Sequence, residues 1–318
     1  MTTKYNNKPI IESMELILQE MKSQRNQRLS TGFESIDKLL NGGLPVGLSI
    51  LGAIPGMGKT TFLLQIADEM AKNGHVVHYF AYEMSRVELV SKSLSRISYA
   101  DEKIKPLTTD EIIDSLQNSD EDEVNKTLIQ YEKSAYTLFI HQCDHSVTFE
   151  ELKKRVLETK TRLQDDKKTV IIVDYLQIMP MGGTKSEKQH LDQLVPDFKR
   201  LSRDAEICVI LISSLNRSNY YKDLDFSSYK ESGSIEYGAD IISGLQFIAK
   251  RNQKNKAKNP SDSIQQEREL IFKEKVKATK DIEFVLLKNR NGIGVGKVNL
   301  AFHSKYHYFE EVVEEECW

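Results

Sequence analysis

Apolar residues occur along the chain in two patterns, as short continuous runs and as stretches with helical spacing. Short continuous runs are typical of strands that are buried on both faces of a sheet. We therefore predict strands over residues 48–51, 76–81, 137–141, 170–173, 207–212, 241–248 and 284–287, followed by a hairpin over 298–302 and 306–309.

The stretches between these runs place apolar residues every three or four positions, which indicates amphipathic helices. Helices are predicted over residues 61–72, 86–97, 149–163 and 187–203, and a charged helical stretch over 110–133. Pro196 should kink the helix that contains it. Because apolar strands alternate with helices, the sequence predicts an α/β fold with a mainly parallel sheet flanked by helices and a C-terminal β-hairpin.

Other segments fall outside this alternation. Residues 10–24 read as a short amphipathic helix, which could pack on its own domain or dock on a neighbouring one. Residues 250–281 are rich in lysine and lack apolar periodicity, so a solvated insertion is the simpler interpretation and a nucleic-acid patch the alternative. We expect an N-terminal extension over residues 1–28 and a domain over residues 29–318 that contains this insertion.

Residues 53–60 read A-x-x-x-x-G-K-T between a predicted strand and a predicted helix, which is the pattern of a nucleotide-phosphate loop. Glycines at 56 and 58 let the backbone N–H groups curl around a phosphate, and the helix that follows adds the positive end of its dipole. Lys59 would reach the β- and γ-phosphates, and Thr60 would hold Mg²⁺. Ala53 stands where the pattern usually has its first glycine. The residues assigned to the nucleotide are Ala53, Pro55, Gly56, Met57, Gly58, Lys59, Thr60, Thr61 and Asp174.

Two carboxylates follow predicted strands. Asp174 ends the apolar run 170–173, and in a parallel sheet such a position lies at the edge where ligands bind. We therefore predict that Asp174 and Thr60 hold Mg²⁺ together. Glu83 follows the run 76–81, where it could polarise the water that attacks the γ-phosphate or could cap the next helix. These residues alone leave both interpretations open.

The composition adds limits to the function. The chain has 318 residues and a net charge of −3, so no global basic field indicates nucleic acid, and local patches must carry that argument. Its cysteines, Cys143, Cys208 and Cys317, lack metal-site spacing and suit a reducing compartment. The sequence has no run long enough for a membrane helix and no signal-peptide core, so we expect a cytoplasmic protein without a membrane partner.

A series of motifs resembles, in order, the C-terminal motor domain of the DnaB-type replicative helicases, a RecA-like P-loop ATPase. The motifs are T-G-F-x-x-I-D at 31–37, G-G-L at 42–44, Y-E-M-S at 82–85, D-Y-L-Q at 174–177, L-N-R at 215–217, E-S-G-S-I-E at 231–236, A-D at 239–240, K-N-R-N-G at 288–292 and A-F-H at 301–303. The resemblance covers about residues 30–309, interrupted at the lysine-rich insertion, and implies a RecA-like fold.

The resemblance also implies roles. Glu83 matches the catalytic glutamate of the family and Asp174 its metal-associated aspartate, while Lys288 and Arg290 match a basic pair that reaches the γ-phosphate of a neighbouring subunit. A guanidinium supplied in trans stabilises charge in the transition state and couples hydrolysis to the subunit interface. The implied cofactors are ATP and Mg²⁺. The implied partners are single-stranded DNA, further copies of the chain in a hexameric ring, and other replication proteins.

Two loops would contact single-stranded DNA by the same resemblance. The residues assigned are Gly182, Gly183 and Lys185 after Gln177, and Arg217, Tyr220, Lys222 and Lys230 after Asn216. Glycine N–H groups and lysines suit phosphates, and tyrosines of the second loop, Tyr221 and Tyr229 included, could stack on bases. Plain exposed loops are the alternative interpretation.

The chain also departs from the family pattern. Ser214 stands where the family has a glutamine that would sense the γ-phosphate and report to the DNA loop, and serine is too short to span that gap without a water. Pro196 interrupts a helix that is normally continuous. We expect the helical N-terminal domain of full-length replicative helicases to be absent, with residues 10–24 resembling the linker helix that docks on an adjacent motor domain.

Our leading hypothesis is an ATP-dependent DNA helicase or translocase of the DnaB type, acting in DNA replication. The alternative is a RecA-like regulatory or loader-type ATPase that binds DNA or a partner without unwinding, which Ser214 and the missing N-terminal domain favour. A small-molecule kinase would need an acceptor pocket and a lid with arginines, and the sequence carries neither signature.

Overall fold

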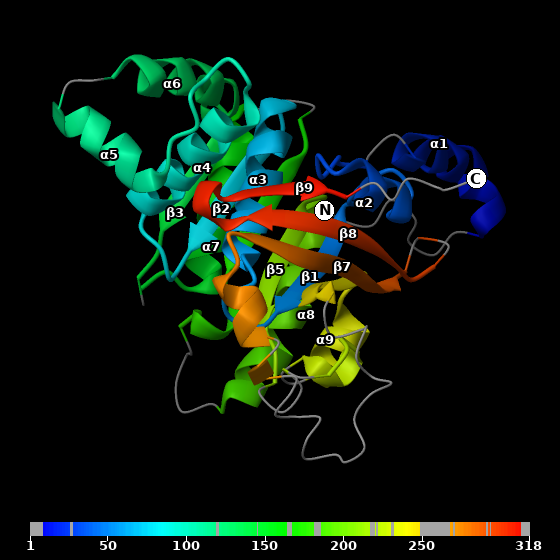
Figure 1. Ribbon diagram of the computed structural model, residues 1–318. Helices are drawn as coiled ribbons and strands as arrows, with labels where there is room; N and C mark the ends of the chain where they lie inside the picture. The colour runs from blue at the N-terminus through cyan, green and yellow to red at the C-terminus, as the bar shows by residue number, and fades with distance from the viewer. Residues whose placement is uncertain are drawn as a thin grey trace, which may run out of the picture.

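The centre of the protein is a nine-stranded sheet in the order β3-β2-β4-β5-β1-β6-β7-β8-β9, seen in a computed structural model (Figure 1). The structure describes residues 9–25, 28–118, 121–144, 146–163, 167–180, 186–216, 220, 222–229, 232–248, 268–269, 271–290, 292 and 294–312. The strands are β1 (Gly47–Ala53), β2 (Val76–Ala81), β3 (Leu138–Gln142), β4 (Thr169–Asp174), β5 (Cys208–Ser214), β6 (Ile241–Phe247), β7 (Thr279–Asn289), β8 (Gly296–His303) and β9 (Tyr308–Glu311).

The sheet changes direction once across its width. Strands β3, β2, β4, β5, β1 and β6 run parallel to one another, and β7, β8 and β9 continue the sheet in antiparallel fashion. Every residue of β1, β2, β4 and β6 is buried, which explains why these strands appear in the sequence as continuous apolar runs. The predicted parallel sheet and C-terminal hairpin are confirmed.

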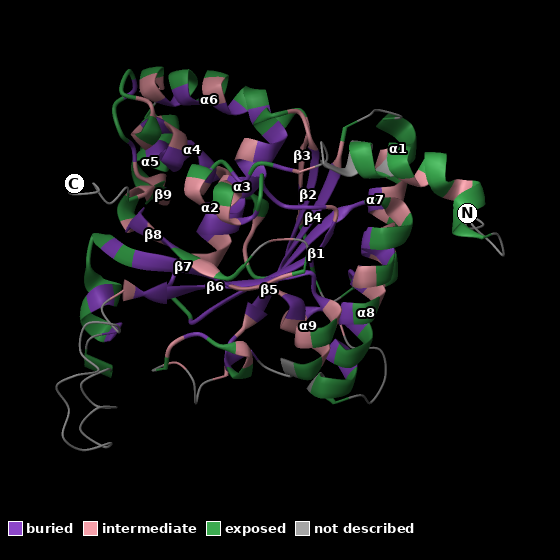
Figure 2. Ribbon diagram, turned by 90° about the vertical axis from the view of Figure 1, so that its right-hand side faces the viewer, coloured by how far each residue is buried: buried purple, intermediate pink, exposed green. Residues whose placement is uncertain are grey.

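Helices cover both faces of the sheet (Figure 2). The longer helices are α1 (Met14–Arg25), α3 (Lys59–Lys72), α4 (Arg86–Ala100), α5 (Thr109–Asn118), α6 (Asp122–Ala135), α7 (Phe149–Leu163) and α8 (Glu187–Ala205). The shorter ones are α2 (Glu34–Leu39), α9 (Ser232–Gly238), η1 (Ile10–Ser13), η2 (Leu176–Ile178), η4 (Phe226–Ser228) and η6 (Ser304–Tyr306). In Figure 2, α3, α4 and α6 lie on one side of the strands, and α7, α8 and α9 lie on the other.

The structure corrects the expected extent of the lysine-rich insertion. Strand β7 begins at Thr279 rather than near 284, and residues 271–276 are helical. The reason is packing: Ile282 is completely buried in the sheet, and Lys280 is also buried, with its ammonium 5.4 Å from the ring centroid of Phe302. Residues 249–267 and 270 lie outside the described part of the chain.

Helix α8 differs from expectation in another way, because it runs unbroken through Pro196. Its neighbours Val195 and Phe198 are completely buried, so tertiary packing holds the helix together although Pro196 removes one N–H donor. The interruption expected at this residue is therefore wrong.

Helix α1 and the η1 turn before it expose the apolar side of the predicted amphipathic helix. Ile11 is 76% exposed and Met21 is 61% exposed. Ile10 and Leu18 are also exposed, so these side chains do not pack on the part of their own domain that the structure describes. Within the described residues, no helix is both long and apolar enough to cross a membrane.

Candidate active site

The phosphate loop connects the central strand β1 to the start of α3. Gly56 and Gly58 have φ angles of +85° and +83°, a left-handed conformation that glycine adopts without strain. Ala53 is the last residue of β1, is completely buried, and lies beside Ser214 of β5. It is part of the strand and not of the turn, so the backbone at this position needs no glycine.

Buried side chains anchor the loop to the core. Met57 is completely buried and Ile54 nearly so. A Cβ atom on Gly58 would stand 2.9 Å from Phe302 and 3.0 Å from Phe309, whose rings stack with their centroids 4.2 Å apart. The C-terminal hairpin therefore supports the phosphate loop directly.

The side chain of Lys59 folds back into this loop. Its Nζ donates to the carbonyl oxygens of Ala53 at 2.9 Å and Ile54 at 3.3 Å. Burial lowers the pKa of Lys59, and the nearby charges of Asp174 and Glu83 act in the opposite direction. The ammonium is therefore held at the inner surface of the loop, where a bound phosphate chain would lie.

Asp174 ends strand β4 and is nearly buried. Its Oδ2 accepts a hydrogen bond of 3.0 Å from the hydroxyl of Tyr79 on the adjacent strand β2, and the side chain of Thr60 also hydrogen-bonds to it. Burial raises the pKa of Asp174, although both hydrogen bonds lower it. A carboxylate beside a threonine hydroxyl at a phosphate loop is a donor set that suits Mg²⁺.

Glu83 lies next to Asp174, because Ala81 of β2 pairs with Asp174 and Tyr82 N donates to the Asp174 carbonyl at 2.9 Å. The alternative role of Glu83 as a helix cap is wrong. Helix α4 is capped by Ser85, whose Oγ accepts from Glu88 N at 3.2 Å in a complete capping box. The exposed carboxylate of Glu83 is thus available at the same strand edge as the phosphate loop.

Lys92 of α4 is a residue of this site that the motifs did not indicate. Burial lowers its pKa, and the carboxylates of Glu88, Asp174 and Glu83 raise it. Its Nζ lies 3.5 Å from the Sδ of Met84. Sequence alone shows Lys92 as an ordinary polar position of an amphipathic helix, and only the fold brings it to the carboxylates. Tyr79 is likewise an ordinary position of an apolar strand in the sequence, and only the fold brings it to Asp174.

Lys288 and Arg290 lie at the opposite end of the sheet from the phosphate loop. Lys288 pairs with Ile242 near the start of β6, and Arg290 N donates to the carbonyl of Asp240 at 2.9 Å. Asp240 in turn accepts from Leu48 N at 2.8 Å, at the beginning of β1. The phosphate loop follows the other end of that strand.

Helix α9 and Asp240 hold these two basic residues. The ammonium of Lys288 donates to the carbonyl of Glu236, and Arg290 donates to the carbonyl of Tyr237 at 3.1 Å. Arg290 also lies 3.5 Å from Asp240, which forms a second, closer ion pair with Lys199 of α8. Asp240 therefore joins the start of β1, helix α8 and the basic pair.

Only some of the residues assigned to DNA binding lie in the described part of the chain. Gly182, Gly183, Lys185, Arg217 and Lys230 lie outside the described residues, as does Tyr221. Lys222 is exposed, and Tyr220 packs partly against the core. The expectation that Tyr229 stacks on a base is wrong, because its ring is buried and its hydroxyl donates to the carbonyl of Ser243.

Gln177 connects the ends of strands β4 and β5, which precede the two loops expected to contact DNA. Its amide donates to Ser213 Oγ at 3.0 Å and accepts from Ser214 N at 3.2 Å. The side chain of Gln177 thus occupies the region beside Ser214, at the ends of β4 and β5.

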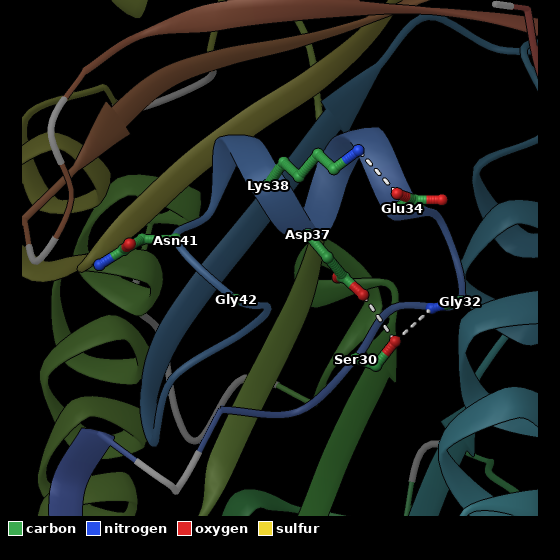
Figure 3. A pocket seen from close by; sticks show the side chains of 7 residues that line it. All are labelled: Ser30, Gly32, Glu34, Asp37, Lys38, Asn41 and Gly42. Carbon is green, nitrogen blue, oxygen red and sulfur yellow. Dashed lines mark hydrogen bonds and ion pairs between the residues drawn. The ribbon is translucent and has the colours of Figure 1, made fainter.

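The hollow around α2 shows how the T-G-F-x-x-I-D motif works (Figure 3). It has a volume of about 550 Å³, and Asp37 lies at its wall. Asp37 accepts from Ser30 Oγ at 2.6 Å and from Thr31 N at 2.9 Å, which fixes the turn before α2. The motif residue Asp37 therefore has a structural role, away from the phosphate loop.

A protein-family model matches most of the chain. The family described as DnaB-like helicase C terminal domain matches residues 28–311. Among curated proteins, the replicative DNA helicase DnaB of Pasteurella multocida (strain Pm70) is 28% identical over 292 residues, which cover 90% of this chain and 56% of that protein. The replicative DNA helicase DnaB of Helicobacter pylori (strain ATCC 700392 / 26695) is 28% identical over 333 residues, covering 96% of this chain and 64% of that protein.

Solved structures share the fold. A solved ATPase domain superimposes with a TM-score of 0.76 and 22% identity, covering 97% of this chain and all of that domain. The structure of a DnaB-like replicative helicase and its interactions with primase gives a TM-score of 0.73 and 22% identity, covering 98% of this chain and 68% of that one. The chain thus spans between about half and two thirds of the length of the curated relatives named above.

Proposed function

The chain belongs to the DnaB-like helicase C-terminal domain family, and from this premise we propose that it is an ATP-driven helicase or translocase that acts on single-stranded DNA in replication. The nucleotide would bind at the phosphate loop, and hydrolysis would take place at the interface between two subunits of a ring, for which we propose six members. Such an activity belongs in the cytoplasm. Residues 1–28 would form an extension to the motor domain.

The residues of the site divide the chemistry between them. Lys59 and the backbone N–H groups of the loop would bind the phosphates, and Thr60 with Asp174 would hold Mg²⁺, which neutralises phosphate charge when bound. Glu83 would accept the proton of the attacking water. Tyr79 keeps Asp174 in place, and Lys92 supplies a positive charge near both carboxylates.

The position of Arg290 is the observation that carries the proposal. Arg290 is attached at the level of Leu48, and the phosphate loop begins after Ala53, five residues further along β1. At about 3.3 Å per residue, roughly 17 Å of strand separates the two points. Since hydrogen bonds to Tyr237 and Asp240 hold the guanidinium at its own end, it would serve the nucleotide of a neighbouring copy.

The exposed apolar residues of α1 support the same assembly. Ile11 and Met21 need a cover that the described residues do not provide, and a neighbouring motor domain would supply it. The loops after Gln177 and Asn216 leave from the phosphate-loop edge of the sheet, so we propose them as the DNA contacts, with Lys222 as a phosphate-binding residue.

Mixing two inactive variants tests whether the site is shared. Lys59→Ala removes the phosphate-binding lysine and Arg290→Ala the trans residue, so each protein alone should lose ATP hydrolysis. In rings assembled from equal amounts of both, roughly a quarter of the head-to-tail interfaces carry both intact residues. We expect about that fraction of the parent rate to return. A mixture as inactive as its components would contradict a shared site.

A regulatory or loader-type ATPase is the second candidate, and Ser214 favours it. Position 214 carries a short serine at the end of β5. The side chain of Gln177 hydrogen-bonds to Ser213 and to the backbone of Ser214 beside it. A forked duplex with a labelled strand separates the two functions. A helicase releases the strand when ATP is hydrolysed, whereas a regulator hydrolyses ATP and leaves the duplex intact.

A further inference from the structure

The segment before strand β7 is fixed to the domain at both ends. Ile271, at the start of helical residues 271–276, is buried in the main hydrophobic core. After the helix, the carbonyl of Ala278 accepts hydrogen bonds from Ser304 N at 3.0 Å and from Ser304 Oγ at 2.8 Å. The backbone between these anchors is therefore held against the domain.

One face of this short helix is turned toward the protein. Residues three positions apart share a face, so Ile271 and Glu274 point the same way. Ile271 and Glu274 are both 6% exposed, which identifies that face as the inner one. Phe272 and Val276 are each 68% exposed and mark the outer face.

Lys275 is exposed and lies beside the phosphate loop. Its Cε, Cδ and Nζ atoms are 3.6, 3.8 and 3.9 Å from the position that a Cβ atom would take at Gly56. Gly56 is itself exposed. In Figure 1 the segment is drawn in orange, next to the loop that follows β1. The side chain of Lys275 thus lies beside Gly56 of the phosphate loop.

The charges around this position favour an anionic ligand. Burial lowers the pKa values of Lys59 and Lys280, and the positive charge of Lys275 contributes to both effects. No carboxylate of the described residues forms an ion pair with Lys275, so within the described structure its charge is not neutralised. Like charges gathered at one place repel each other, and a polyanion between them removes that cost.

We propose that Lys275 is a second phosphate-binding lysine of the nucleotide site, supplied by the same subunit and reaching the phosphate chain across Gly56. The proposal rests on the proposed function, because it needs a nucleoside triphosphate in the phosphate loop. The motifs shared with the helicase family assign no role to this segment. Since the contact would be made to the β- or γ-phosphate, which AMP lacks, Lys275 would strengthen the binding of ATP and leave the binding of AMP nearly unchanged.

Equilibrium binding of ATP and AMP tests the proposal. We would compare the parent chain with Lys275→Ala, Lys275→Arg and Lys273→Ala; Lys273 is an exposed lysine of the same helix. Lys275→Ala should weaken ATP binding by about tenfold, the size of one charge-assisted contact, and change AMP binding by less than about twofold. Lys275→Arg should restore most of the affinity, and Lys273→Ala should bind ATP as the parent does.

Two outcomes overturn the role of Lys275. One is parent-like ATP affinity in Lys275→Ala when Lys59→Ala binds weakly, which leaves the proposed function intact. The other is an equal loss in Lys275→Ala and Lys273→Ala, which indicates a general effect of surface charge. A parent chain that binds no ATP at all would instead reject the proposed function, and the role of Lys275 with it.

Protection from chemical modification gives a second measurement, independent of affinity. Acetylation of surface lysines by an amine-reactive reagent can be followed by mass spectrometry with and without ATP. ATP should slow the modification of Lys275 severalfold and leave Lys273 unchanged. Equal rates at Lys275 with and without saturating ATP would overturn the proposed contact.

Discussion

The hydroxyl of Tyr79 donates a hydrogen bond of 3.0 Å to the Oδ2 of Asp174, from the strand that lies beside it in the sheet. Tyr79 is completely buried, so water does not compete for this hydrogen bond. It orients the carboxylate that faces Thr60 and helps to keep it ionised, because the bond lowers a pKa that burial raises.

We therefore expect Tyr79→Phe to weaken the binding of Mg²⁺ at Asp174. The variant should need a severalfold higher Mg²⁺ concentration for half-maximal ATP hydrolysis. Loss of the hydrogen bond raises the pKa of Asp174 in the variant, so the difference from the parent should grow as the pH falls. Its free energy of unfolding should fall by about 1 kcal/mol, the value of one buried hydrogen bond. Titrating Mg²⁺ at several pH values measures the first effect and urea unfolding the second.

Tyr82→Phe is the matched control, since Tyr82 donates an equivalent bond of 2.7 Å to the carbonyl of Val147. It should lose similar stability and keep the parent Mg²⁺ dependence. Equal Mg²⁺ dependence in both variants would show that Tyr79 acts on the fold alone.

Glu83→Gln should separate binding from hydrolysis. The amide keeps the size of the side chain and loses the base, so the rate of ATP hydrolysis should fall by about 10² to 10⁴. ATP binding and thermal stability should match the parent, since Glu83 caps no helix. Glu88→Gln alters the capping box of the same helix and should keep hydrolysis. Parent-like hydrolysis in Glu83→Gln would rule out Glu83 as the base.

Asp240→Asn should loosen the basic pair from the sheet. Asp240 is nearly buried and bonds to Leu48 N, Lys199 and Arg290, so loss of its charge should lower the free energy of unfolding by about 2 kcal/mol. ATP hydrolysis should fall while ATP binding by the same chain stays near the parent value. Asp197→Asn, in a more exposed pair with Arg200, should change stability by less than about 0.5 kcal/mol.

Acid should destabilise the protein between pH 6.5 and about 4. Burial lowers the pKa of His78 to about 3 and those of His141 and His307 to about 4. An unfolded chain protonates these groups near pH 6.5, so it binds more protons than the folded one, and stability falls as the pH falls. Each histidine contributes a slope of up to about 1.4 kcal/mol per pH unit.

His307→Asn isolates one of these contributions. His307 has a φ of +56°, which asparagine tolerates, so stability at pH 7 should change little. Urea unfolding at pH 7, 6 and 5 should show a shallower decline than the parent. An unchanged decline would mean that His307 ionises normally in the folded protein.

Sequence patterns predict the parts of this site that depend on local order. The phosphate loop and Asp174 follow continuous apolar runs, and buried parallel strands leave such runs in any sequence. Tyr79 and Lys92 escape prediction, because their roles arise from the pairing of β2 with β4 and from the packing of α4, which no short motif records.

Tyr229 illustrates how a reasonable prediction can fail. An aromatic residue in a predicted loop indicates an exposed stacking surface. Here, however, the ring of Tyr229 occupies the space on the face of β1 that a side chain at Gly52 would fill. A Cβ atom at Gly52 would lie 2.5 Å from Cε1 of Tyr229. The absence of one side chain in β1 therefore decides the position of a residue far along the chain.

The contact of Gly58 with Phe302 and Phe309 has a consequence for how the protein is made. The phosphate loop is among the first parts of the domain to leave the ribosome, and the two rings that support it are among the last. Contacts so distant in sequence close late in folding. A nascent chain that stops before strand β9 should therefore carry the nucleotide motif without a formed nucleotide site, and we expect firm ATP binding only once the β8–β9 hairpin has been translated and packed.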